Sequence, residues 1–114
     1  MPDSAIRLRA AAPSDARAIA ALLTELGHPC EAVDIPARLA AVHEDHGAAF
    51  VVVDGADAPL GLMSLSRHVT LHAPGPIAYI TALVTSSAAR RRGVGKMLVD
   101  EAKRWAAEHG CVRL

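Results

Sequence analysis

The sequence RRRGVGK at positions 90–96, together with the segments on either side of it, gives the clearest indication of the fold. The apolar segment 77–85, IAYITALVT, has the composition of a strand, and 94–110 has the spacing of an amphipathic helix. The first N–H groups of a helix have no partner within the helix, and the helix dipole makes that end partly positive. A strand, a glycine-containing turn and a helix start therefore predict a cradle for a phosphate group.

The residue types in this turn support the same interpretation. Gly93 and Gly95 lack a Cβ, so an anion can approach the backbone, and the neighbouring arginines add a positive field. Two common phosphate-binding motifs do not fit. A Walker A loop would need glycine where the chain has Arg90 and serine or threonine where it has Met97. A dinucleotide-binding fingerprint would need a third glycine in place of Leu98.

The pattern that remains is R-x-x-G-x-G, placed between a strand and a helix. In this setting it resembles the coenzyme A pyrophosphate loop of the GNAT (Gcn5-related N-acetyltransferase) superfamily. The resemblance extends over nearly the whole chain. Residues 6–9 and 12–15 are similar to the family's opening strand and the start of its first helix, and 80–85 are similar to its fourth strand. Residues 94–110 are similar to its third helix, and 111–114 to the start of its fifth strand.

The resemblance implies an α/β (α+β) fold, with a GNAT-like mixed central sheet and flanking helices in the order β-α-α-β-β-β-α-β. The residue pattern agrees with this order. Helical spacing covers 16–26 and begins again near 34, and strand-like segments cover 50–53 and 60–69. The family's last helix and strands are missing from the sequence. We therefore expect a single GNAT-like acetyltransferase domain, 1–114, without its C-terminal part.

The composition argues against several other classes of protein. The 12 basic and 12 acidic residues cancel, so net charge gives no reason to expect a nucleic acid or an anionic membrane as partner. The longest apolar run, 48–53, is far too short to cross a bilayer. Cys30 and Cys111 lie far apart without a CxxC spacing, which favours reduced thiols and a cytoplasmic protein.

The resemblance implies acetyl-coenzyme A as the co-substrate, and no metal. Backbone N–H groups of the loop would bind the pyrophosphate, and the strand segment before the loop would lie beside the pantetheine arm. One exposed N–H near Val84 would hold the thioester carbonyl oxygen, whose negative charge grows in the transition state. The residues expected to bind the co-substrate are Leu83, Val84, Thr85, Arg90, Arg91, Arg92, Gly93, Val94, Gly95 and Lys96.

The reaction implied is transfer of an acetyl group from acetyl-coenzyme A to a primary amine of a small molecule or a protein. An ammonium is not a nucleophile, so some group must take its proton. Several family members use a carboxylate on the fourth strand, and this chain has none there. The catalytic residues stay unknown, with the Val84 backbone, Tyr79, Glu25 and Glu31 as candidates. A core position for Tyr79 and solvated positions for the two glutamates are the competing interpretations.

Two other functions stay open, as does the oligomeric state. A non-catalytic acyl-coenzyme A-binding module would be consistent with the missing C-terminal elements. A nucleic-acid binder using 90–92 would have strongly salt-dependent affinity, but the chain has few aromatic residues on which bases could stack. A sheet that ends at a truncated fifth strand would leave an apolar edge, from which we expect a homodimer.

The histidines suggest a metal site that their spacing does not support. His43 and His46 lie three residues apart and could share a helix face, but no third ligand follows at a suitable spacing. A solvated helix end is the preferred interpretation. His68 and His72 flank the loop before 77–85, where an acceptor could enter, although a loop surface accounts for them as well.

Overall fold

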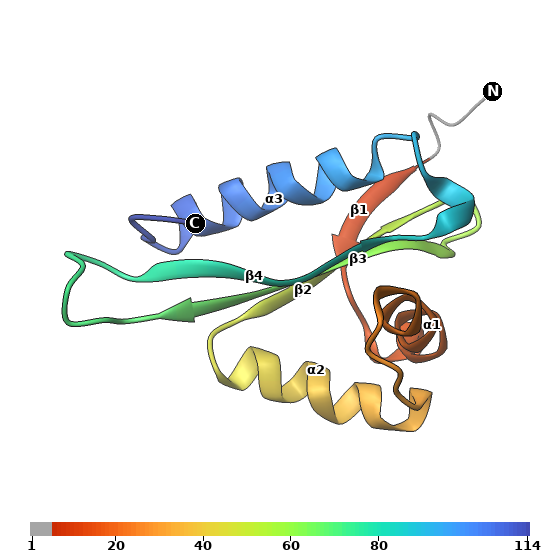
Figure 1. Cartoon of the computed structure of the whole chain (residues 1–114), viewed down its shortest axis with the longest axis horizontal. Helices are drawn as coiled ribbons and strands as arrows, with labels where there is room; N and C mark the ends of the chain where they lie inside the picture. Colours follow the sequence, from red (N-terminus) through yellow and green to blue (C-terminus); the bar gives the residue numbers. More distant parts are fainter. Residues whose placement is uncertain (1–5) are drawn as a thin grey trace.

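The computed structural model describes residues 6–114, so the first five residues of the predicted domain lie outside it. A four-stranded sheet has helix α3 on one face and helices α1 and α2 on the other (Figure 1). The elements are β1 (Arg7–Ala10), α1 (Ala16–Leu26), α2 (Ile35–Glu44), β2 (Ala48–Val53), β3 (Pro59–His68), β4 (Ile77–Thr85) and α3 (Val94–Glu108). Their order agrees with the predicted one. Across residues 6–114, no helix has the length and apolar character needed to cross a membrane.

The sheet has the order β1-β2-β3-β4, and each neighbouring pair is antiparallel. The predicted fifth strand, 111–114, forms only a single parallel bridge, between Arg113 and Ile77 at the start of β4. Two hydrogen bonds accompany the bridge: Ala78 N–H donates to Arg113 O at 2.9 Å, and Val112 N–H donates to Pro76 O at 2.8 Å. The segment thus lies beside the start of β4 without forming a full strand, and leaves most of the outer edge of β4 unpaired within residues 6–114.

Strand β2 is buried on both faces, which explains its unbroken apolar sequence AAFVVV. Successive side chains of a strand point to opposite faces of the sheet, so they enter two separate core layers. Ala48, Phe50 and Val52 pack in the layer beneath α3, whereas Ala49, Val51 and Val53 pack in the layer beneath α1 and α2. The sheet therefore separates the packing of α3 from that of the other two helices.

Helix α3 packs closely against the sheet at Gly61 of β3. A Cβ at this position would lie 2.5 Å from Val94 Cγ1, 3.2 Å from Val84 O and 3.3 Å from Leu98 Cδ1. These neighbours are buried and cannot move aside freely. The absence of a side chain at Gly61 is what lets the first turn of α3 lie against the sheet.

Gly61→Ala is expected to destabilise the protein by about 1–3 kcal/mol, the usual cost of forcing an extra methyl into a packed core. The urea concentration at the unfolding midpoint measures this change. Gly95→Ala is the matched control, since a Cβ there meets only Thr85 Oγ1, at 3.8 Å. Equal midpoints for the two variants would contradict the close packing at Gly61.

A β-bulge interrupts the pairing of β3 with β4. Ser64 pairs with Ala82 and the next residue, Leu65, pairs with Ile80, so Thr81 is an extra residue on β4. The Ser64 and Thr81 hydroxyls lie 2.6 Å apart and share a hydrogen bond. Bulges bend a strand and re-aim its side chains, and they are frequent next to active sites.

The start of α1 is tied to β1 by a buried carboxylate. Asp15 accepts hydrogen bonds from Arg9 Nη1 and Nη2, both at 2.8 Å, and from Ala12 N–H at 2.8 Å. Arg9 Nε also donates to Asp57 Oδ1 at 2.9 Å, in the turn between β2 and β3. The hydrogen bonds from Arg9 hold the pKa of Asp15 below its usual range, although burial opposes the shift. The cluster of Arg9, Asp15 and Asp57 links three parts of the chain.

Candidate functional site

The predicted phosphate loop connects β4 to α3 through a short 3-10 turn and a segment with left-handed backbone conformation. The Ser86 hydroxyl accepts a hydrogen bond from Ala88 N–H at 3.3 Å and begins a short 3-10 turn, η4 (Ser87–Ala89). Further on, Arg91 has φ 71° and Gly93 has φ 79°, both in the left-handed region. Glycine adopts this conformation freely, whereas for arginine it is uncommon and costs energy. The loop therefore holds Arg91 in a conformation that its own preference disfavours.

Helix α3 begins without a side-chain cap. Gly93 occupies the N-cap position and has no side chain with which to accept a hydrogen bond from the first turn. The N–H groups of Val94, Gly95 and Lys96 therefore have no partner within the helix. The Lys96 ammonium ion-pairs with Asp100 at 2.7 Å, one helical turn further on, and lowers the pKa of that carboxyl. This end of α3 presents N–H groups and a partial positive charge.

The packing of the chain does not require glycine at position 95. A Cβ there would meet only Thr85 Oγ1, at an ordinary contact distance of 3.8 Å. Glycine inside a helix costs up to about 1 kcal/mol relative to alanine. The missing side chain leaves open space beside the unpartnered N–H groups and the end of β4.

The outer edge of β4 carries outward-facing N–H groups at defined positions. Ser86 N–H donates to Leu60 O at 2.8 Å, so Leu60 and Ser86 form a hydrogen-bonded pair. Hydrogen-bonded and non-bonded pairs alternate in an antiparallel ladder, and Val84 is paired with Leu62. Val84 therefore turns its N–H toward β3.

The two neighbours of Val84 complete this pattern. By the same alternation, Leu83 and Thr85 direct their N–H groups away from β3. Ala78 N–H, which donates outward to Arg113 O, fits the alternation once the extra residue Thr81 is counted. The exposed N–H that the family resemblance implies near Val84 is thus expected at Leu83 or Thr85.

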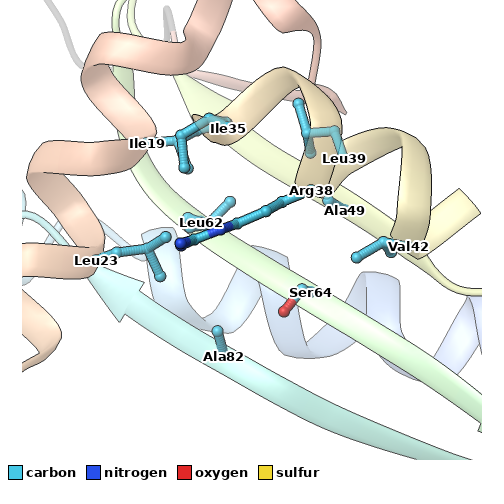
Figure 2. A pocket seen from close by; sticks show the side chains of 10 residues that line it. All are labelled: Ile19, Leu23, Ile35, Arg38, Leu39, Val42, Ala49, Leu62, Ser64 and Ala82. Atoms are coloured by element: carbon cyan, nitrogen blue, oxygen red, sulfur yellow. The ribbon is translucent and has the colours of Figure 1, made fainter. Parts of the chain in front are cut away.

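A cavity of about 190 Å³ lies on the other face of the sheet, beneath α1 and α2 (Figure 2). It reaches β4 at Ala82, the residue before Leu83. Among residues 6–114, the polar side chains that line it are Arg38 and Ser64. The apolar lining consists of Ile19, Leu23, Ile35, Leu39, Val42, Ala49, Leu62 and Ala82.

The structure separates the three predicted side-chain candidates for catalysis. Glu25, at the end of α1, accepts a hydrogen bond from Ser87 N–H at 3.0 Å and so lies at the loop after β4. Tyr79 is half exposed rather than in the core, in edge-to-face contact with His68 at 5.3 Å between ring centroids. It lies about 13 Å along β4 from Leu83. Glu31 is exposed in the connection between α1 and α2.

His43 and His46 lie away from this edge, whereas His72 lines a hollow with Tyr79 and Leu114 beside the start of β4. His43 and His46 line a hollow with Arg67 and His109, at the end of the sheet opposite the loop. His68 Nε2 shares a hydrogen bond of 3.0 Å with Ser66 Oγ. Among residues 6–114, no three His, Cys, Asp or Glu side chains gather in a group that could hold a metal ion.

Sequence reasoning missed Arg38, although a signal was present. Ile35, Leu39 and Val42 form the apolar stripe of α2, and Arg38 stands at i+3 on the same helical face. An arginine within an apolar stripe indicates a side chain that lies beside apolar surface, and Arg38 lines the cavity although it is exposed. The bulge at Thr81 had no comparable signal, since it depends on the register between two strands.

Comparison with known proteins identifies the family. A model of the acetyltransferase (GNAT) family matches residues 15–114. Among solved structures, an acetyltransferase from Trypanosoma brucei has 20% identity and a TM-score of 0.83, with 95% of this chain and 79% of that one covered. A GNAT family acetyltransferase from Staphylococcus aureus has 20% identity and a TM-score of 0.82, with coverage of 96% and 83%.

A glucosamine-6-phosphate N-acetyltransferase from Arabidopsis thaliana has 19% identity and a TM-score of 0.82, with 95% of this chain and 78% of that one covered. A search of curated protein sequences finds no match. The structural similarities speak for the fold, while the family model spans most of the chain. Both confirm the resemblance predicted from the loop and its flanking elements. The chain belongs to the GNAT acetyltransferase family.

Proposed function

We propose that this protein is an acetyl-coenzyme A-dependent N-acetyltransferase that acts on a primary amine. Membership of the family supports acyl transfer in general. The observation that carries the specific proposal is the open space at Gly95, beside the unpartnered N–H groups of the first turn of α3. A glycine that packing does not need, at a helix end that favours anions, is suited to close approach by a phosphate.

Each part of the co-substrate has residues suited to it. The backbone N–H groups from Arg91 to Lys96 are proposed to bind the pyrophosphate, with Arg90 and its neighbours adding positive charge. The outward N–H groups of Leu83 and Thr85 are proposed to lie along the pantetheine arm, as an added strand would. When bound, acetyl-coenzyme A supplies an acetyl group activated as a thioester.

Leu83 N–H is the proposed donor to the carbonyl oxygen, since it adjoins Ala82 at the cavity. In the overall reaction the amine nitrogen bonds to the acetyl carbon, the C–S bond breaks, and the thiolate takes one proton. A second proton leaves the ammonium and is released. Glu25, whose carboxylate accepts a hydrogen bond from Ser87 N–H in the loop after β4, is our candidate for the group that takes the proton from the amine.

Calorimetric titration of the chain with acetyl-coenzyme A, desulfo-coenzyme A and ATP tests the proposal. Binding of both coenzyme A compounds, and not of ATP, is expected, because only they carry the pantetheine arm. Thiol release with a panel of amines then measures turnover. Binding without turnover would favour a non-catalytic acyl-coenzyme A-binding module. A folded chain that binds neither compound would overturn the proposal.

Leu83→Pro is expected to lower kcat by about 10²–10³, the usual effect of removing one oxyanion donor. Proline deletes the outward N–H of Leu83 but no hydrogen bond to β3, and an edge strand tolerates it on that side. Val84→Pro is the contrast, since it deletes an N–H that faces β3 and should lower stability instead. Steady-state kinetics and thermal unfolding distinguish the two. An unchanged kcat in a folded Leu83→Pro variant would rule out this donor.

The homodimer stays a proposal as well. Exposed apolar side chains flank the open edge of β4, among them Tyr79, Ile80 and Leu114. A second copy could cover this edge by strand pairing. Light scattering over a range of protein concentrations is the measurement. A monomer mass at every concentration would contradict it.

A further inference from the structure

Arg38 lies over the apolar cavity without a charged partner. Its side chain leaves α2 and extends across the cavity toward Leu23 of α1 and Leu62 of β3 (Figure 2). Among residues 6–114, none makes a hydrogen bond or ion pair with Arg38, whereas Arg9 and Arg104 are each paired with carboxylates. Among residues 6–114, the lining of the cavity thus has one positively charged side chain and no negatively charged one.

We propose, resting on the proposed function, that Arg38 binds a carboxylate of the acceptor, which is an apolar amino acid. A planar guanidinium binds a carboxylate through two parallel hydrogen bonds, with more directional specificity than an ammonium provides. The apolar lining favours such a pair on the side that faces the protein, and the other side of Arg38 is exposed to solvent. The alternative is that the methylene groups of Arg38 cover the cavity while its guanidinium stays in solvent.

The size and lining of the cavity determine what the rest of the acceptor is. The volume is about 190 Å³. An engineered apolar cavity of about 150 Å³ holds benzene, so this one accommodates a branched aliphatic or an aromatic side chain. Ser64 is the only neutral polar side chain in the lining, and its hydroxyl is already bonded to Thr81. A sugar would lose most of its hydrogen bonds there, which is costly.

The charge of the cavity argues against polycationic acceptors. No aspartate or glutamate lines it, so a second ammonium group would meet Arg38 without a compensating carboxylate. Such like-charge contacts oppose binding. A monoamine that brings its own carboxylate avoids this repulsion and neutralises Arg38.

The position of the cavity is suited to the reaction. Arg38 reaches across it from α2, and Ala82 of β4 forms part of its wall. Ala82 adjoins Leu83, whose outward N–H is the proposed oxyanion donor. An amino acid with its carboxylate at Arg38 and its side chain in the cavity would present its amine toward β4.

The kinetic test compares amines with and without a carboxylate. L-phenylalanine and L-leucine are set against phenethylamine and isopentylamine, in the wild type and in Arg38→Gln. The variant is expected to raise KM for the two amino acids by about tenfold to a hundredfold, as for a lost charged hydrogen bond. KM for the two plain amines should not rise, and the affinity for acetyl-coenzyme A should stay the same. Arg17→Gln, on the exposed face of α1, is the matched control.

A binding test does not depend on turnover. 3-Phenylpropanoate, which has the carboxylate and ring but no amine, is expected to bind the wild type and to bind Arg38→Gln at least about tenfold more weakly. Arg38→Lys should restore only part of this affinity, because it keeps the charge without the planar fork. Equal binding to wild type and Arg38→Gln, or faster turnover of the plain amines than of the amino acids by the wild type, would overturn the inference. If the folded wild type does not bind acetyl-coenzyme A at all, the proposed function is refuted instead.

Discussion

Gly95→Glu is expected to abolish acetyl-coenzyme A binding, with an affinity loss of about a hundredfold or more. A side chain at this position would fill the open space beside the first turn of α3, and its negative charge would face the pyrophosphate. Like charges in direct contact cost several kcal/mol, and each 1.4 kcal/mol is about tenfold in affinity. Calorimetric titration of the variant measures the loss.

Stability distinguishes this effect from unfolding. A glutamate in the first turn of a helix interacts favourably with the helix dipole, and position 95 has room for a side chain, so Gly95→Glu should remain folded. Gly95→Ala should even gain up to about 1 kcal/mol of stability. Lys103→Gln, on the exposed face of α3, is the control for the change in net charge. Unchanged affinity in Gly95→Glu would remove the basis of the proposed phosphate site.

Arg9→Met is expected to cause a large loss of stability. Its removal would leave the Asp15 carboxylate, with a side chain only 5% exposed, without its charged partner. Breaking a buried ion pair in this way costs about 3–5 kcal/mol, and the lower value applies here because Arg9 is itself 22% exposed. At about 4 °C per kcal/mol for a domain of this size, the melting temperature should fall by roughly 12 °C.

Arg7→Met provides the matched control on the same strand. Arg7 pairs with Asp57 at 2.8 Å, but both side chains are more than half exposed, so the loss should stay below about 1 kcal/mol.

The pKa of Asp15 is lowered in the folded protein, so its stabilisation is fully present above the unfolded value of about 3.9. It is lost as the pH falls through the folded value. The stability difference between wild type and Arg9→Met should therefore shrink below about pH 4, and a constant difference would contradict this account.

The loop and its flanking elements could be predicted because their signals are local. Each signal determines the backbone conformation of nearby residues. The signals are Gly93, the apolar residues of 77–85 and the helical spacing of 94–110. The start of α3 at Val94 and the strand before the loop were therefore both predictable. The predicted fold class is confirmed by the family model and by the solved structures.

The features that sequence reasoning missed depend on contacts between distant segments. The cluster of Arg9, Asp15 and Asp57 joins residues up to 48 positions apart, and no periodicity indicates such a contact. The bond from Ser87 N–H to Glu25 spans 62 positions. The sequence also could not predict which N–H groups of β4 face outward, because the register with β3 and the extra residue Thr81 determine them.

The separation of the core into two layers affects how this protein can change over time. The layer beneath α3 supports the proposed co-substrate loop, and the layer beneath α1 and α2 surrounds the cavity at Arg38. Substitutions at sites that share no contacts have nearly independent effects on stability. A lineage, or a mutant library confined to α1 and α2 that leaves Glu25 and its bond to Ser87 unchanged, can thus explore new acceptors while the co-substrate loop is inherited intact.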